Sequence, residues 1–131
     1  MDTVSAKIDT RLYRTEIISG SGNILISDEP QQLGGKNLGL NPTELLASSL
    51  ASCTLITLRM YINRKQWNVS EINIKIDFER DSERNVTSFI RKIEVTGEVD
   101  EAQKQRLETI ANSCPIHKTL TNTIEIKTTL I

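Results

Sequence analysis

Residues 45–58 form a stretch without a single charged side chain, in which apolar residues dominate. A helix built from this stretch has apolar side chains on nearly every side, so protein must cover it almost all round. Asn41 suits the N-cap of such a helix, Pro42 suits its first turn, and Glu44 can bond back to the cap. The stretch therefore predicts a long, buried central helix over residues 41–64.

A helix of this length is long for a chain of 131 residues. At ~1.5 Å per residue it would span roughly 36 Å, which is more than a compact monomer of this size covers comfortably. An isolated monomer would leave much of the helix in water, at ~25 cal/mol for each Å² of exposed apolar surface. We therefore expect a homodimer.

Alternation of apolar and polar residues predicts strands on both sides of the central helix. We expect strands at residues 4–8, 13–19 and 24–26, a loop at 28–40, a hairpin whose strands cover 72–79 and 89–99, and a last strand at 124–130. Asp100, with Gln103 at the capping-box position, predicts a second, amphipathic helix, and a short helical turn should follow at 115–120. This order predicts one α+β domain over residues 1–131, with antiparallel sheets packed on the long central helix.

Composition excludes several classes of function. With 25% charged residues and a net charge of -1, the chain lacks the basic field that binds nucleic acid or acidic lipid. It has no glycine-rich nucleotide-binding pattern. The first residues lack an apolar signal core, and the uncharged run is shorter than the ~20 residues that span a bilayer. We therefore expect a cytoplasmic protein with no nucleic-acid or membrane partner and no cofactor.

The chain has two cysteines, Cys53 and Cys114, and one histidine, His117. Two cysteines are too few for the disulfide framework of a small secreted protein, and with one histidine they are too few for a zinc site. Two interpretations remain open from the residues alone. The cysteines are either inert thiols of the core or a pair that reacts together.

The surroundings of each cysteine predict different reactivity. Cys114 precedes Pro115 at the expected start of a helical turn and is close to Lys118, and such a position lowers the pKa of a thiol. Cys53 lies inside the uncharged helix, hidden from bulk water, and should react only if a cation from elsewhere reaches it. If the two sulfurs meet, the expected reaction is attack of one thiolate on a peroxide, followed by a disulfide with the other.

Two motifs resemble those of the OsmC-like family, which includes the organic hydroperoxide resistance proteins. The first is Asn-Pro-Thr-Glu-Leu-Leu at residues 41–46, with Ala-Ser-Cys ending at Cys53, eleven residues beyond the proline. The second is Cys-Pro-Ile-His at residues 114–117, which is similar to the second-cysteine region of one branch of the family. The resemblance extends over essentially the whole chain, including the order of its elements.

The resemblance implies an intertwined homodimer, with two long helices packed between sheets and active sites at the dimer interface. It implies that Cys53 is the peroxidatic thiol and Cys114 the resolving thiol of an organic hydroperoxide peroxidase that a dithiol reduces. It also implies an arginine from the N-terminal segment that holds the Cys53 thiolate. Arg11 fits that position best, and Arg14 is the alternative.

One position departs from the family pattern. The acidic partner of that arginine should directly follow the proline, where this chain has Thr43, and Glu44 comes one residue later. At ~100° per residue, Glu44 lies on the opposite side of the helix from Cys53. Glu44 is therefore either a catalytic acid or only a helix cap. The departure also supports an alternative function, a non-catalytic dimeric domain that binds a small apolar ligand.

Overall fold

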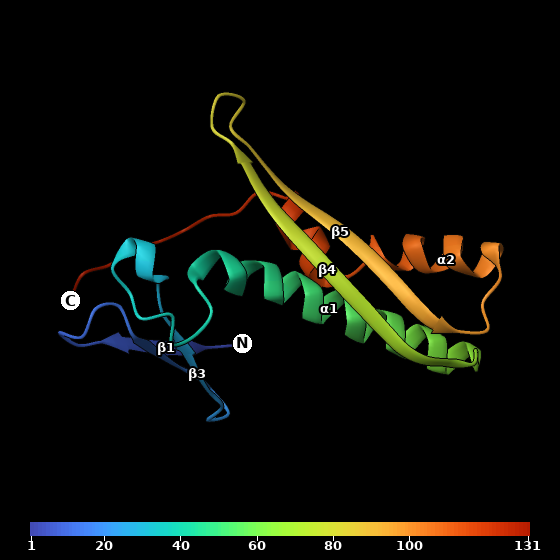
Figure 1. Cartoon of the computed structure of the whole chain (residues 1–131), viewed down its shortest axis with the longest axis horizontal. Helices are drawn as coiled ribbons and strands as arrows, with labels where there is room; N and C mark the ends of the chain where they lie inside the picture. Colours follow the sequence, from blue (N-terminus) through green and yellow to red (C-terminus); the bar gives the residue numbers. More distant parts are fainter. The chain divides into compact units, whose positions relative to one another are not determined.

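The computed structural model describes residues 1–131 of the chain. The chain divides into two compact units, Met1–Leu46 and Ala47–Ile131, which are described separately. The elements of each unit are labelled in Figure 1.

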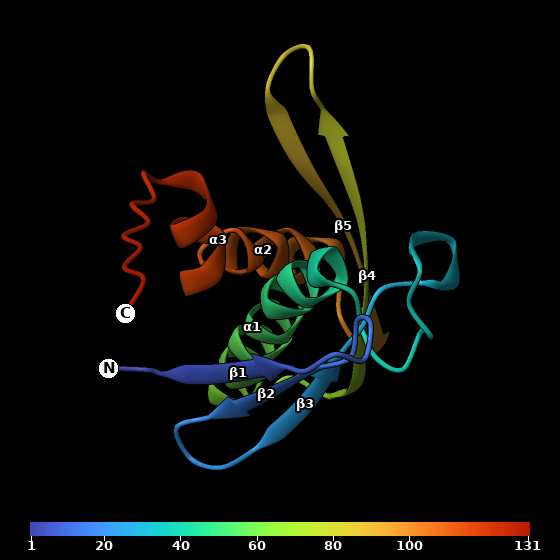
Figure 2. The same ribbon diagram turned by 90° about the vertical axis from the view of Figure 1, so that its left-hand side faces the viewer.

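The first unit contains a three-stranded antiparallel sheet in the order β1-β2-β3. Its strands are β1 (Val4–Ile8), β2 (Thr15–Ser19) and β3 (Ile24–Ser27), which lie side by side in Figure 2. The three strands predicted from alternation are therefore confirmed. All five residues of β1 are exposed in the single chain, although apolar–polar alternation is typical of a half-buried strand.

The loop after β3 is organised around Asp28, whose side chain is buried at 2% exposure. Its Oδ1 accepts from the backbone N–H groups of Tyr13 (3.1 Å) and Glu29 (2.8 Å), and its Oδ2 accepts from those of Lys36 (3.2 Å) and Leu38 (3.1 Å). Burial raises the pKa of Asp28, but the four donors together outweigh it, so the pKa lies below its usual value. One carboxylate thus fixes a loop that includes the 3-10 helix Gln31–Leu33.

Replacing Asp28 by asparagine should destabilise the chain. An amide keeps one acceptor oxygen and turns an NH₂ group toward two backbone donors, which lose their partner. Since the folded pKa of Asp28 is below the unfolded value of about 3.9, the carboxylate stabilises the fold above that pH, and the contribution is lost as pH falls through the folded pKa. In thermal unfolding followed by circular dichroism, D28N should melt several degrees lower at neutral pH and lose less stability on acidification. D2N, which removes an exposed carboxylate, should melt like the wild type, and equal melting of D28N would contradict this assignment.

The central helix α1 (Pro42–Lys65) begins at the end of the first unit and runs into the second. Its predicted capping box is confirmed, because the Glu44 amide donates to Asn41 Oδ1 (2.8 Å) and the Asn41 amide donates to Glu44 Oε1 (3.0 Å). The single chain does not supply the all-round cover predicted for this helix. Only one face is buried, whereas Ile56 is 53% and Met60 66% exposed.

By length and composition alone, α1 could cross a membrane, contrary to the expectation that its apolar run is too short. The core helix of a soluble protein passes the same test. Here Leu58, Tyr61 and Ile62 pack in a core with Leu107 and Ala111 of the next helix. One face of α1 therefore belongs to the core of the second unit.

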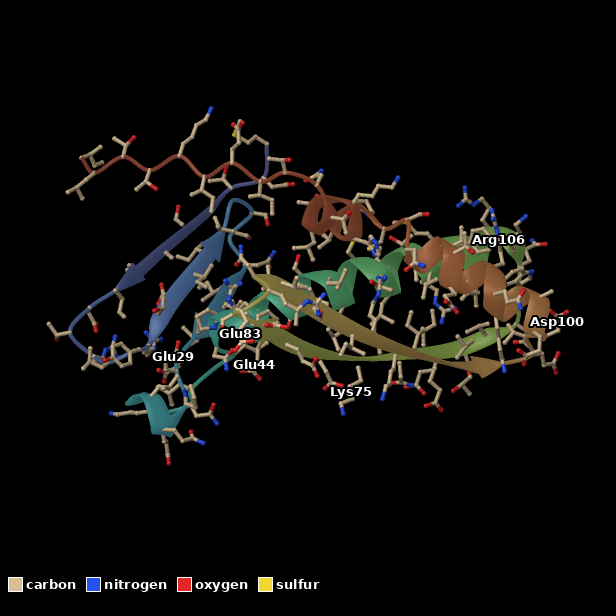
Figure 3. All side chains as sticks on the ribbon, turned by 90° about the horizontal axis from the view of Figure 1, so that it is seen from above. Glu29, Glu44, Lys75, Glu83, Asp100 and Arg106 are labelled. Atoms are coloured by element: carbon tan, nitrogen blue, oxygen red, sulfur yellow. The ribbon has the colours of Figure 1, made fainter.

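The rest of the second unit is a hairpin followed by two helices. Its elements are β4 (Val69–Asp81), β5 (Val86–Gly97), α2 (Glu101–Ala111) and α3 (Pro115–Thr121). Figure 2 shows α1 and α2 on one side of the hairpin, and in Figure 3 Lys75 points from the opposite face. The predicted capping box of Asp100 with Gln103 is confirmed at the start of α2. Together these elements form the mixed α+β fold with antiparallel sheets that the sequence predicts.

The predicted last strand is wrong for the single chain. Residues 122–131 form no strand, and Ile126 and Leu130 are among the most exposed apolar residues. Alternation marks a segment that is able to pair, but a strand needs the free edge of another strand to supply its hydrogen bonds. No strand of this chain pairs with these residues.

Candidate functional site

Both cysteines belong to the second unit, and both are free thiols. Cys114 is fully buried at 0% exposure and is the N-cap of α3, where its Sγ accepts from the backbone N–H of His117 (3.4 Å). Cys53 on α1 is only half-buried, so the expectation that its thiol is hidden is wrong for the single chain. The reason is its place at the edge of the covered face of α1, next to the fully buried Thr54.

Thr54 connects α1 to Cys114. Its Oγ1 lies 2.7 Å from the carbonyl oxygen of Leu50, to which it donates, and 3.7 Å from Cys114 Sγ. The residue that follows Cys53 in sequence is thus the one that contacts the other cysteine. We call Cys53, Thr54 and Cys114 the two-cysteine site.

An arginine on β5, Arg91, forms hydrogen bonds with residues around this site. Arg91 Nη1 donates to Thr54 Oγ1 (2.9 Å) and to the carbonyl oxygen of Ala111 (3.1 Å), and its Nη2 donates to Asn112 Oδ1 (3.0 Å). Nη2 also lies 2.9 Å from His117 Nδ1. A guanidinium has no acceptor, so Nδ1 of His117 must accept and the ring proton of the neutral imidazole is on Nε2. We call Arg91 with these four partners the Arg91 cluster.

Sequence analysis missed Arg91, although the sequence contains a signal for it. Phe89, Ile93 and Val95 are half-buried on the inner face of β5, and Arg91 has the same parity. In the register of the hairpin it faces Ile76, a residue of the apolar face of β4. A single cation among the inward positions of an otherwise apolar strand face indicates a specific partner.

Several groups act on the pKa of Cys114. Burial is the largest and raises it, because an apolar setting disfavours the thiolate. The His117 amide, the Thr54 hydroxyl and the Cys53 thiol lower it as hydrogen-bond donors, and the charge of Arg91 lowers it as well. The net shift of the pKa is downward, which agrees with the direction expected from the sequence. Lys118, the cation named in that expectation, is not among the causes.

The other predicted site residues, Arg11 and Glu44, belong to the first unit. Arg11 forms an exposed ion pair with Asp9 (Nη2 to Oδ2, 2.9 Å), which lowers the pKa of Asp9 to about 2. Arg11 and Arg14 both line a small hollow of about 200 Å³ in that unit. Glu44 is held by the capping box of α1. Of the predicted residues, the two cysteines lie in the same unit, where Thr54, the neighbour of Cys53 in sequence, contacts Cys114.

A groove of about 670 Å³ lies between β5 and α2 and adjoins the Arg91 cluster. Apolar side chains line much of it, among them Leu58, Phe89 and Leu107, and Arg91 and His117 lie along its wall. Neither cysteine lines this groove. The described residues contain no group of three or more metal-ligating side chains that could hold an ion.

Comparisons with known proteins agree on one family. A family model described as OsmC-like protein matches residues 34–129. A search of curated proteins finds no significant match.

Solved structures of the same family share the fold. A Psychrobacter arcticus protein, described as a candidate osmotic stress induced and detoxification response protein, is 26% identical with a TM-score of 0.78, over 91% of this chain and 88% of the other. An OsmC-like protein from Mycoplasma pneumoniae is 19% identical with a TM-score of 0.75, over 92% and 86%. The organic hydroperoxide resistance protein OhrB of Bacillus subtilis is 20% identical with a TM-score of 0.63, over 97% and 95%.

Proposed function

Because this chain belongs to the OsmC-like protein family, we propose that it is a thiol peroxidase that reduces organic hydroperoxides with Cys53 and Cys114. The observation that carries the proposal is the presence in one unit of a half-buried thiol, Cys53, and a fully buried thiol, Cys114, whose pKa is lowered. In the single chain Cys53 has exposed surface, whereas Cys114 has none. Organic hydroperoxide resistance proteins among the structures of the same fold support the choice of substrate.

The proposed reaction has two chemical steps and a reduction. The Cys53 thiolate attacks the terminal oxygen of the hydroperoxide, the O–O bond breaks, and the alkoxide takes up a proton to leave as the alcohol. Cys53 is then a sulfenic acid. The Cys114 thiolate attacks its sulfur, an S–S bond forms, and hydroxide leaves and becomes water. A dithiol returns both cysteines to thiols by exchange and is itself oxidised to a disulfide.

The Cys53 thiolate needs a cation for the first step, and we propose Arg11 for that role, with Arg14 as the alternative. An arginine within ~4 to 6 Å lowers a thiol pKa by about one to three units. For Glu44 we propose the role of helix cap, because both of its capping bonds are formed.

Steady-state assays with cumene hydroperoxide and a dithiol reductant test the proposal. We expect turnover that depends on both reagents, and a Cys53–Cys114 disulfide in the mass spectrum after one equivalent of peroxide without reductant. Absence of turnover, together with no loss of free thiol, would contradict the peroxidase assignment.

A second candidate function is non-catalytic binding of a small apolar ligand. The groove of about 670 Å³ favours it, since its size suits a small molecule and neither cysteine lines it. The two functions predict different outcomes of the same mass-spectrometric experiment. Thiols that stay unmodified after peroxide addition favour the ligand-binding domain.

We also propose that the protein is a homodimer that covers the exposed face of α1. Ile56 and Met60 on that face are more than half exposed, and exposed apolar groups of this kind mark interfaces. Sedimentation at low micromolar concentration should give a dimer. M60D should shift it toward monomer, because a carboxylate would be desolvated at the interface, whereas K75E on the outer face of the hairpin should not. A stable, folded wild-type monomer would refute the dimer.

A further inference from the structure

Arg91 has a position that the family resemblance does not assign to any residue. We infer that Arg91 is a positioning residue of the two-cysteine site, which holds Thr54 and His117 against Cys114 so that this thiol is ready as a thiolate to attack oxidised Cys53. The attack on oxidised Cys53 rests on the proposed function. The effect of Arg91 on the ionisation of Cys114 does not, and it can be tested without peroxide.

The first argument is the charge of Arg91. The guanidinium is half-buried, and all four groups that it contacts are neutral. It forms no ion pair with a carboxylate. A partly buried cation without a counter-ion is unfavourable. Thr54 Oγ1 connects Arg91 Nη1 to Cys114 Sγ, so a thiolate at Cys114 would supply the missing negative charge near the guanidinium.

The second argument is the hydroxyl of Thr54, which has one proton and two lone pairs. Arg91 Nη1 occupies one lone pair, and the proton goes to the Leu50 carbonyl at 2.7 Å. When Cys114 is a thiol, its S–H can donate to the second lone pair. When Cys114 is a thiolate, the hydroxyl can turn its proton toward the sulfur instead. Arg91 keeps the oxygen in place for both states.

The third argument is that Arg91 fixes the chain on both sides of Cys114. On the N-terminal side of Cys114, Arg91 donates to the Ala111 carbonyl and to the Asn112 side chain at the end of α2. On the C-terminal side of Cys114, Arg91 contacts the ring of His117, the residue whose backbone N–H donates to Cys114 Sγ. The two donors that lower the pKa of Cys114 most, the His117 amide and the Thr54 hydroxyl, thus both belong to residues that Arg91 holds.

The test uses R91Q, the conservative R91K, and K92Q as a matched control that removes the neighbouring charge on the outer face of β5. In a C53S background, ultraviolet thiolate absorbance is titrated against pH, so that only Cys114 contributes. We expect the titration to move to higher pH in R91Q, to move less in R91K, and to stay in place in K92Q. A merely structural arginine would lower the melting temperature without moving this titration.

With Cys53 present, one equivalent of cumene hydroperoxide is added and the reaction is quenched at intervals by alkylation for mass spectrometry. R91Q should form the Cys53 sulfenic acid normally but close the disulfide roughly tenfold more slowly, since loss of a charged hydrogen-bond donor costs about that factor. If the wild type does not react with peroxide, the proposed function fails while the titration still decides the role of Arg91. If R91Q and R91K both titrate like K92Q and close the disulfide at the wild-type rate, the inference is overturned.

Discussion

Replacing Cys53 by serine should abolish hydroperoxide consumption. A serine hydroxyl stays protonated at neutral pH and is no nucleophile toward the O–O bond, so no sulfenic acid can form at this position. The loss should be complete, with cumene hydroperoxide disappearing only at the rate of the buffer. S52A, a change at the exposed neighbour of Cys53, is the matched control and should react like the wild type.

The C53S experiment decides between two physical arguments. The lowered pKa of Cys114 favours Cys114 as the resting thiolate, whereas the partial exposure of Cys53 favours Cys53 as the thiol that peroxide can reach. We give access the greater weight, because a thiolate without exposed surface cannot meet a bulky substrate. A C53S protein that still consumes one equivalent, with the sulfenic acid mapped to Cys114, would reverse the two roles.

Local rules predicted the elements of this fold well. Both capping boxes, at Asn41 and at Asp100, could be predicted because each depends on residues three positions apart. The hairpin of β4 and β5 could be predicted because its apolar alternation is strict. Such features depend on the chain's own neighbours in sequence.

Features that depend on contacts between elements distant in sequence were predicted less well. Periodicity marked the apolar sides of α1 and of residues 124–130, but it does not say which surface covers them. Arg91 was missed because its meaning depends on Thr54 and His117, which come from other elements. Conversely, the two cysteines were paired through a family resemblance, since nothing in their spacing brings them together.

Replacing Cys114 by serine should leave the first step intact and block the second. Cys53 should then react once with peroxide and remain a sulfenic acid, because no second thiol is present to form the disulfide. Without reductant, further peroxide should convert it to the sulfinic acid, which dithiols do not reduce. Intact-mass spectra should show the gain of one oxygen, then of two, with trapping by a sulfenic-acid reagent only at the first stage.

The wild type is the control for this experiment, since its disulfide should protect Cys53 from the second oxidation. The rate of the first oxidation in C114S shows whether Cys114 also takes part in that step. If C114S oxidises Cys53 at the wild-type rate, Cys114 acts only in the second step. If C114S forms no sulfenic acid at all while the wild type forms its disulfide, the prediction is wrong and Cys114 is required from the first step onward.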